Sequence, residues 1–177
     1  MSIPHLHLAI SHAPLFAALI GFVILIIAVA RRSSEMRWVA FGLFVAAALA
    51  GIPVFLSGEG SEEAIERLPG VSEGLIDAHA AAAKLSLIGI ELLGVLSLIA
   101  FGLERVRHFV PVPLVTAVLL ASGIETASLG YTANLGGQIR HSEVRAVGAG
   151  TNPVGDKVDA DGRDHSAESA KPDSDND

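Results

Sequence analysis

Long apolar stretches alternate with short polar segments along most of the chain. Four stretches of about 19–25 residues are almost continuously hydrophobic: Leu6–Ala30, Trp38–Leu56, Ala80–Leu103 and Val110–Ala133. A helix needs roughly 20 apolar residues to cross a hydrocarbon core of about 30 Å, and a segment in lipid must satisfy its own backbone hydrogen bonds. The pattern therefore predicts an all-α fold, a four-helix transmembrane bundle.

The end of the chain has a different composition. From about Ala146 the sequence is rich in Gly, Asp, Ser and Pro and has few large apolar side chains. Such a segment cannot bury enough apolar surface to offset the entropy lost on ordering. We therefore expect a transmembrane domain over residues 1–145, followed by a disordered acidic tail over residues 146–177.

Basic residues gather in two of the three connections between the apolar stretches. The connection Arg31–Arg37 contains three arginines, and the one after the third stretch contains Arg105 and Arg107. The connection Ser57–Ala78 is acidic and has Arg67 as its single basic residue. Short loops rich in Lys and Arg stay on the cytoplasmic side. We therefore predict a multi-pass protein with both termini and the acidic loop outside.

The acidic connection carries local helix signals. Ser61-Glu62-Glu63-Ala64 resembles a helix start, with Ser61 as the N-cap and acidic residues in the first turn. Leu68-Pro69-Gly70 is expected to end this short helix. Pro53, near the outer end of the second stretch, is expected to kink that span.

Several classes of chemistry are excluded by composition and motif. The chain has no cysteine, so it has no disulfide, thiolate metal site or cysteine nucleophile. The net charge is −7 and no basic patch contains interleaved aromatic residues, which argues against nucleic-acid binding. Neither a phosphate-binding loop nor a nucleophile elbow is present. The sequence thus gives no indication of an independent enzymatic activity.

Histidines gather on the predicted outer side of the membrane. His12 is the deepest of them, directly before Ala13-Pro14, and His79 opens the third span. The first and third spans run in the same direction, so His12 and His79 can approach each other at similar depth. Two histidines on different helices can hold haem iron, and imidazole also suits zinc and copper. The outer-side set consists of His5, His7, His12, His79 and His141.

We take His12 and His79 as the leading ligand pair for haem b or a transition metal, with His141 as a third candidate. His5 and His7 lie on different faces of a helix, so they are not expected to share a metal ion unless that segment is extended. A structural role is the alternative for each histidine, because imidazole at a membrane interface also hydrogen-bonds to backbone and headgroups.

Three ionisable residues lie at membrane depth, where a central charge costs roughly 2.5–3.5 kcal/mol. Lys84 and Glu91 share a helix face, about 10 Å apart, and Glu125 lies near the middle of the fourth span. Antiparallel neighbours would bring Glu125 between Lys84 and Glu91, where an ion pair or a shared proton is expected. Ser122 and Thr126 can add hydrogen bonds. The set is either functional, as a proton path, quinol-type site or partner of a cofactor propionate, or a structural lock on helix register.

Three motifs together resemble a family of small four-span bacterial membrane proteins classed as a domain of unknown function. They are His5-Leu6-His7-Leu8-Ala9-Ile10-Ser11-His12-Ala13-Pro14, the loop from Leu56-Ser57-Gly58-Glu59 to Ile76-Asp77-Ala78-His79, and Leu135-Gly136-Gly137-Gln138-Ile139-Arg140-His141-Ser142-Glu143. The likeness runs over roughly residues 4–144. It implies a four-span bundle in a bacterial inner (plasma) membrane.

The resemblance points to His12, His79 and His141 and to the helix-end motif of Gly136, Gly137 and Arg140, but it implies no activity. Family members usually carry His-Glu at the start of the third span, where this chain has His79-Ala80. That difference weakens any role that needs the carboxylate.

Three hypotheses follow for function. The first is a haem- or metal-binding electron-transfer module that uses the outer histidines. The second is a structural or accessory subunit of a membrane complex without its own cofactor, in contact with other subunits or with copies of itself. Small residues over Ala46–Gly51 allow tight helix packing within or between chains. The third, a proton-coupled transporter, has little support because no discontinuous half-helices are evident.

Overall fold

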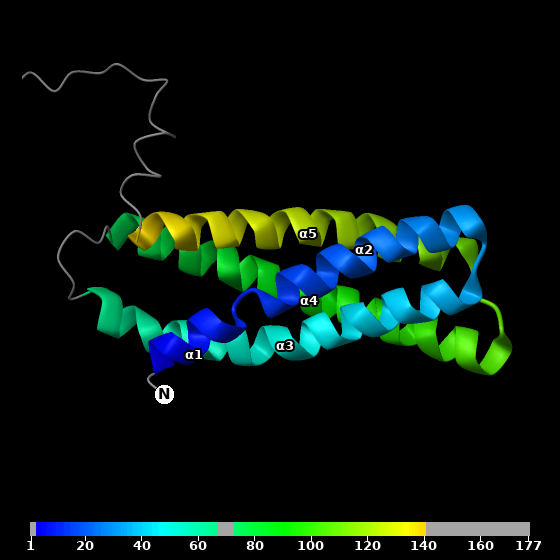
Figure 1. Cartoon of the computed structure of the whole chain (residues 1–177), viewed down its shortest axis with the longest axis horizontal. Coiled ribbons are helices and arrows are strands. Elements are labelled where there is room, and N and C mark those ends of the chain that lie inside the picture. The colour runs from blue at the N-terminus through cyan, green and yellow to red at the C-terminus, as the bar shows by residue number, and fades with distance from the viewer. Residues whose placement is uncertain (1–2, 67–72, 141–177) are drawn as a thin grey trace, which may run out of the picture.

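The computed structural model describes residues 3–66 and 73–140, which form five helices (Figure 1). Four long helices make an antiparallel bundle in which α2 and α4 each pack against both α3 and α5, while the short α1 packs on α3. The predicted all-α, four-helix transmembrane bundle is confirmed. The helices are α1 (Ile3–Ile10), α2 (Ala13–Arg31), α3 (Ser34–Glu66), α4 (Glu73–Arg107) and α5 (Val112–Arg140).

The exterior of the bundle is apolar, as expected of a surface that contacts lipid. The stretches His7–Arg31, Ser34–Ser61, Glu73–Arg107 and Val112–Ile139 are each long and apolar enough to cross a membrane. Large apolar side chains such as Leu49, Leu85, Leu120 and Ile124 lie exposed on its surface. A soluble protein rarely leaves so much contiguous apolar area in water. The chain is therefore an integral, multi-pass membrane protein.

Small residues let the helices approach closely inside the bundle. A Cβ added at Gly94 of α4 would lie 2.5 Å from the Cβ of Ala48 on α3, and one added at Gly21 of α2 would lie 2.7 Å from the ring of Phe44. Ala47, Ala48 and Gly51 are buried against the other helices of the same chain. This part of the Ala46–Gly51 stretch therefore serves packing within the chain, as small residues do in membrane bundles.

The first apolar stretch is not one continuous helix. It divides into α1 and α2 at a turn formed by Ser11 and His12. Pro14, in the first turn of α2, has no N–H to donate to the carbonyl of Ile10, so a continuous helix would lose a hydrogen bond and clash at this point. As a result α1 lies against α3, so His5 and His7 belong to α1 whereas His12 lies in the turn before α2.

The second span continues further than the sequence pattern indicated. α3 runs past Pro53 as far as Glu66, and the Ser61 hydroxyl donates a 2.7 Å hydrogen bond to the carbonyl of Ser57, one turn earlier. Ser61 is thus an interior residue of α3, and the predicted short helix starting at Ser61 is wrong. Local bonding of a serine to the preceding turn is compatible with a continuing helix. Leu68-Pro69-Gly70 lies outside the described residues.

The two ends of the bundle differ in chemistry. The turns α2–α3 and α4–α5 meet at one end, on the right in Figure 1, and we call it the arginine end after Arg31, Arg32, Arg37, Arg105 and Arg107. The other end holds α1, the start of α4 and the end of α5, and we call it the histidine end.

A buried ion pair ties α3 to α4 near the arginine end. The guanidinium of Arg37 donates from Nε to Oε2 of Glu104 over 2.9 Å and from Nη2 to Oε1 over 2.6 Å. The Glu104 side chain is only 2% exposed. Beside this pair the ring of Trp38 packs on Phe101, and the guanidinium of Arg105 lies 5.5 Å from the Trp38 ring centre. The two-point geometry fixes the register of the two helices.

Candidate functional site

His7 is the first histidine that the fold holds in a defined orientation. It projects from α1 onto α3, where its half-buried Nδ1 lies 3.1 Å from the carbonyl oxygen of Val54 and 3.1 Å from the hydroxyl of Ser57. A carbonyl can only accept, so Nδ1 carries the proton in this contact, and in the neutral ring Nε2 keeps its lone pair. The ring rests on Gly58, where a Cβ would lie 3.2 Å from its Cε1.

His79 repeats this arrangement on the other side of the bundle. It projects from α4 onto α5, and its Nδ1 lies 3.0 Å from the carbonyl oxygen of Thr132. A Cβ added at Gly136, one turn further along α5, would lie 3.1 Å from Cε1 of His79. Each histidine thus donates to the carbonyl of residue i on its neighbour and packs on a glycine at i+4.

His7 and His79, which we call the histidine pair, lie at the same end of the bundle. The charges of His79 and His12 are close enough to act on His7. Among the described residues, neither Nε2 has a hydrogen-bond partner. The histidine pair therefore offers two half-buried imidazoles, each with an anchored Nδ1 and with an Nε2 that bonds to no other residue of the described part of the chain.

The other predicted ligands are placed differently. His12 is exposed on the turn before α2, where its Nδ1 lies 3.1 Å from the hydroxyl of Ser11 and its ring stacks on Phe16. It belongs to the histidine end but packs only along its own segment. His141 lies outside the described residues. His7 was not among the leading predicted ligands, because its position depends on α1 turning back onto α3.

Hydroxyl groups of α4 and α5 contact one another next to the residue that binds His79. The Ser86 hydroxyl of α4 lies 2.8 Å from that of Ser128 and 3.0 Å from that of Thr132, both on α5. The carbonyl of Thr132 accepts the hydrogen bond from His79, so these hydroxyl contacts hold the acceptor residue in place. Gly136 and Gly137 lie inside α5, and Arg140 is its last residue. Nothing approaches within 4 Å of a Cβ added at Gly137.

The intramembrane acids face separate parts of the bundle. Glu125 lies buried against the backbone of Gly89 on α4, and Glu91 has a buried Oε1 near Gly51 on α3. Lys84 is exposed on α4 and forms no ion pair with any described residue. The expected ion pair between Lys84 and an acid is therefore not formed. Gly89 leaves room for the carboxyl group of Glu125 against the backbone of α4.

Neither Glu91 nor Glu125 receives the hydrogen bonds that were expected from the hydroxyls of the fourth span. The Ser122 hydroxyl donates to the carbonyl of Leu119 over 2.9 Å, and the Thr126 hydroxyl donates to that of Ser122 over 2.7 Å. Oε1 of Glu91 and Oε1 of Glu125 are both buried without a hydrogen-bond partner among the described residues. Buried oxygens without a hydrogen-bond partner are rare in folded proteins, so these two carboxyl groups are unusual features of the bundle.

The described residues contain no group of three or more histidine, cysteine or acidic side chains that could hold a metal ion. A structural zinc site normally has four protein ligands. Two imidazoles on different helices suit instead a group that needs only two axial ligands, such as a haem, or an ion that completes its coordination with other donors.

Comparisons of the chain with models of known families, with curated proteins and with solved structures give no match. The resemblance to a family of small bacterial membrane proteins therefore stays a prediction, and the function is inferred from the geometry of the chain itself.

Proposed function

We propose that this protein is a membrane-embedded electron-transfer module that binds haem b or a transition metal between His7 and His79. One observation carries the proposal. Both rings of the histidine pair are oriented through Nδ1 by a backbone carbonyl of a neighbouring helix, and neither Nε2 has a hydrogen-bond partner among residues 3–66 and 73–140. Histidines that bind metals almost always donate their other ring N–H to a carboxylate, a backbone carbonyl or a water in this way.

Haem is the favoured group because it needs only two axial ligands from the protein. Bundles of four helices commonly build cofactor sites from side chains on facing helices. The glycines under the two rings, Gly58 and Gly136, let each imidazole lie close against its neighbouring helix. Such a module would exchange electrons at the membrane surface to which the histidine end belongs, which the charge distribution predicts to be the outer one.

The proposal differs from the sequence-based hypothesis in its ligand pair. His79 is retained, and His7 takes the leading place that His12 held, because His7 is oriented by α3 whereas His12 is not. His12 lies near enough to interact with His7 by charge. In this proposal His12 lies beside the site and is not one of the two ligands.

The test is an absorption spectrum of the full chain purified in detergent, first oxidised and then reduced with dithionite, with metal analysis of the same sample. The protein is expressed with ample haem and metal. We expect a Soret band with sharp α and β bands on reduction, and loss of these bands in His7→Ala and in His79→Ala. His108→Ala, at the arginine end, is the matched control and should keep the spectrum.

A second outcome is a featureless spectrum with one equivalent of copper or zinc that is lost in the same two variants. This result would keep the site and identify the group as a metal ion. A featureless spectrum without stoichiometric metal would contradict the proposal. The chain would then be treated as an accessory subunit, and its partner would be sought by crosslinking in the native membrane.

A further inference from the structure

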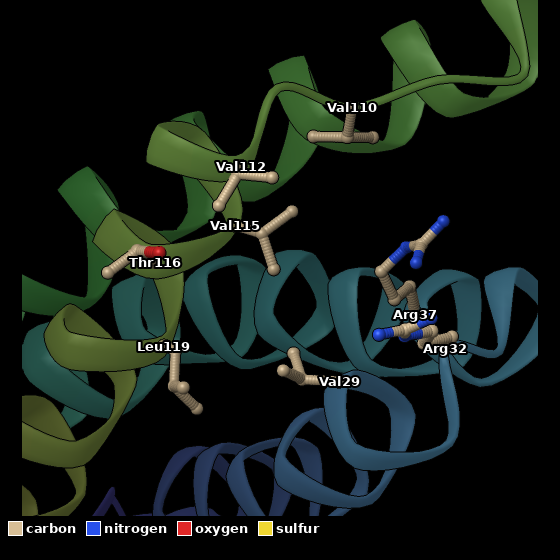
Figure 2. Close-up of a pocket in the computed structure, with 8 residues that line it drawn as sticks. All are labelled: Val29, Arg32, Arg37, Val110, Val112, Val115, Thr116 and Leu119. Atoms are coloured by element: carbon tan, nitrogen blue, oxygen red, sulfur yellow. The ribbon is translucent and has the colours of Figure 1, made fainter.

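A cavity of about 180 Å³ lies at the arginine end, between the end of α2 and the start of α5 (Figure 2). Its walls are mostly apolar and include Val29, Val115 and Leu119, whereas Arg32 and Arg37 lie together on another side. This cavity is at the opposite end of the bundle from the histidine pair, and nothing in the proposed electron-transfer role uses it.

The two arginines of the cavity are not equivalent. Arg37 is held by Glu104 through Nε and one hydrogen of Nη2, so its charge is compensated, and its Nη1 donates to no described residue. Arg32 is exposed and forms no ion pair with any described residue. Its backbone is in the left-handed conformation, with φ 53° and ψ 35°, and its N–H caps α2 by bonding to the carbonyl of Val29. The cavity therefore combines apolar walls with one uncompensated cation in a fixed backbone position.

The volume of the cavity limits what it can hold. At about 30 Å³ per water molecule in the liquid, 180 Å³ corresponds to about six waters. Sites that enclose a whole small-molecule ligand usually measure about 300–1,000 Å³. The cavity thus fits only part of a larger amphiphile, the rest of which lies along the exposed apolar surface of the bundle. Val112, which is 72% exposed at the start of α5, belongs to both the cavity and that surface.

The position of the cavity agrees with a lipid as its occupant. Arg32 follows the last residue of α2, at the level where a spanning helix meets the headgroups. The arginine end is predicted to be cytoplasmic, and the cytoplasmic leaflet is rich in anionic lipids that basic pockets between transmembrane helices bind. A guanidinium can donate two parallel hydrogen bonds to a phosphate group, and the headgroup region of an anionic phospholipid supplies that phosphate.

We propose that this cavity binds the glycerol-phosphate part of an anionic phospholipid, with the phosphate on Arg32 and the adjoining carbon atoms against Val29, Val115 and Leu119. Arg37 adds a hydrogen bond from Nη1 while it stays paired with Glu104. The bound lipid then fills the space between α2 and α5 at this end of the bundle.

The experiment measures binding of phosphatidylglycerol to the full chain in detergent by native mass spectrometry. Removing one surface cation is expected to weaken binding about fivefold, so Arg32→Gln should show this loss and Arg32→Lys should recover most of it. Val115→Phe, which fills the cavity without changing charge, should also reduce binding. Arg107→Gln is the matched control at the same end but outside the cavity, and it should bind as the unmodified chain does.

Three outcomes would overturn the proposal. Equal binding of zwitterionic phosphatidylcholine would show that the net negative charge of the lipid is not recognised, so the site would not select an anionic phospholipid. An equal loss in Arg107→Gln would show diffuse attraction to the whole arginine end. Displacement of the lipid by inorganic phosphate at a similar concentration would make free phosphate the ligand. Arg32→Gln and Arg32→Lys alter only an exposed side chain, so their comparison decides the question even if Val115→Phe fails to fold.

Discussion

At the residue scale, glycines decide where the polar groups of this bundle lie. Gly89 lets the carboxyl group of Glu125 rest against the backbone of α4. Gly58 and Gly136 accept the rings of the histidine pair in the same way. A polar group in a lipid-facing bundle must find its place inside, because the bilayer offers no water to solvate it.

Gly89→Ala should destabilise the protein, because a Cβ at this position would overlap the carboxyl group of Glu125. Overpacking of this kind costs about 1–3 kcal/mol. The free energy of unfolding, measured by SDS titration in mixed micelles, should fall accordingly. In the double variant Gly89→Ala, Glu125→Ala the carboxyl group is gone, so the added methyl group should cost less than it does alone.

Gly102→Ala is the matched control in the same helix, since nothing lies within 4 Å of a Cβ there. Its stability should stay the same or rise slightly, because alanine is the better helix former by about 1 kcal/mol. An equal loss of stability in both variants would show that Gly89 matters for its backbone and not for the space it leaves to Glu125.

The ion pair of Arg37 and Glu104 also acts at the level of single residues. Removal of one partner of a buried pair leaves an uncompensated charge and typically costs about 3–5 kcal/mol. We expect Arg37→Met and Glu104→Leu each to lower the free energy of unfolding by an amount of this order. The combined variant should recover most of the loss, because the two apolar side chains can pack against each other.

Glu35→Gln provides the control for these variants, since Glu35 is an exposed acid on the same helix as Arg37. If the double variant lost the sum of the two single effects, Arg37 and Glu104 would act independently. The buried pair would then not explain the register of α3 and α4.

At the element scale, the same helix-to-helix contact occurs twice. In one case α1 presents His7 to Val54 and Gly58 of α3, and in the other α4 presents His79 to Thr132 and Gly136 of α5. The spacing of four residues places the acceptor carbonyl and the glycine on the same face of the neighbouring helix. The repeat arises from packing and not from an internal sequence repeat.

Gly136→Leu should therefore remove cofactor binding, whereas Gly137→Leu should not. A side chain at Gly136 meets the ring of His79, while one at Gly137 meets nothing within 4 Å. Both changes place the same residue in the same helix, so differences in helix propensity cancel. The measurement is the reduced absorption spectrum or the metal content per chain. Retention of the cofactor bands, or of the metal, in both variants would contradict a role for His79 as a ligand.

The elements themselves were predictable to different degrees. All four spanning helices follow from the apolar stretches, because length and hydrophobicity alone determine that a segment crosses a bilayer. The division into α1 and α2 did not follow, although Pro14 marks it, because a proline near a helix start is also compatible with one continuous helix. The extension of α3 to Glu66 was missed because Ser61 resembles an N-cap in the sequence.

At the scale of the whole molecule, the charges at the two ends predict an orientation. The arginine end should face the cytoplasm and the histidine end the outside. The chain contains no cysteine, so single cysteines can be introduced without a background. We expect Glu59→Cys to react with a membrane-impermeant maleimide in intact cells, and Arg107→Cys to react only after the membrane is permeabilised.

Both positions are exposed and lie toward opposite ends of the bundle, so accessibility to the reagent depends on the side of the membrane and not on burial. Labelling of Arg107→Cys in intact cells, with Glu59→Cys protected, would show that the orientation is opposite to the predicted one. The proposed cofactor site would then face the cytoplasm, and the proposed lipid site would face the outer leaflet.

What the sequence determined by itself is the membrane bundle with its four spans. These features depend on the sum of many apolar side chains along each segment, so no single contact decides them. The tertiary structure decided which polar groups meet. His7 is held by α3 and His79 by α5 at the same end of the bundle, Lys84 forms no ion pair with the acids, and Arg37 pairs with Glu104. Each of these outcomes depends on the rotation of one helix against another, which is set by close packing at glycine and alanine and cannot be obtained from hydropathy.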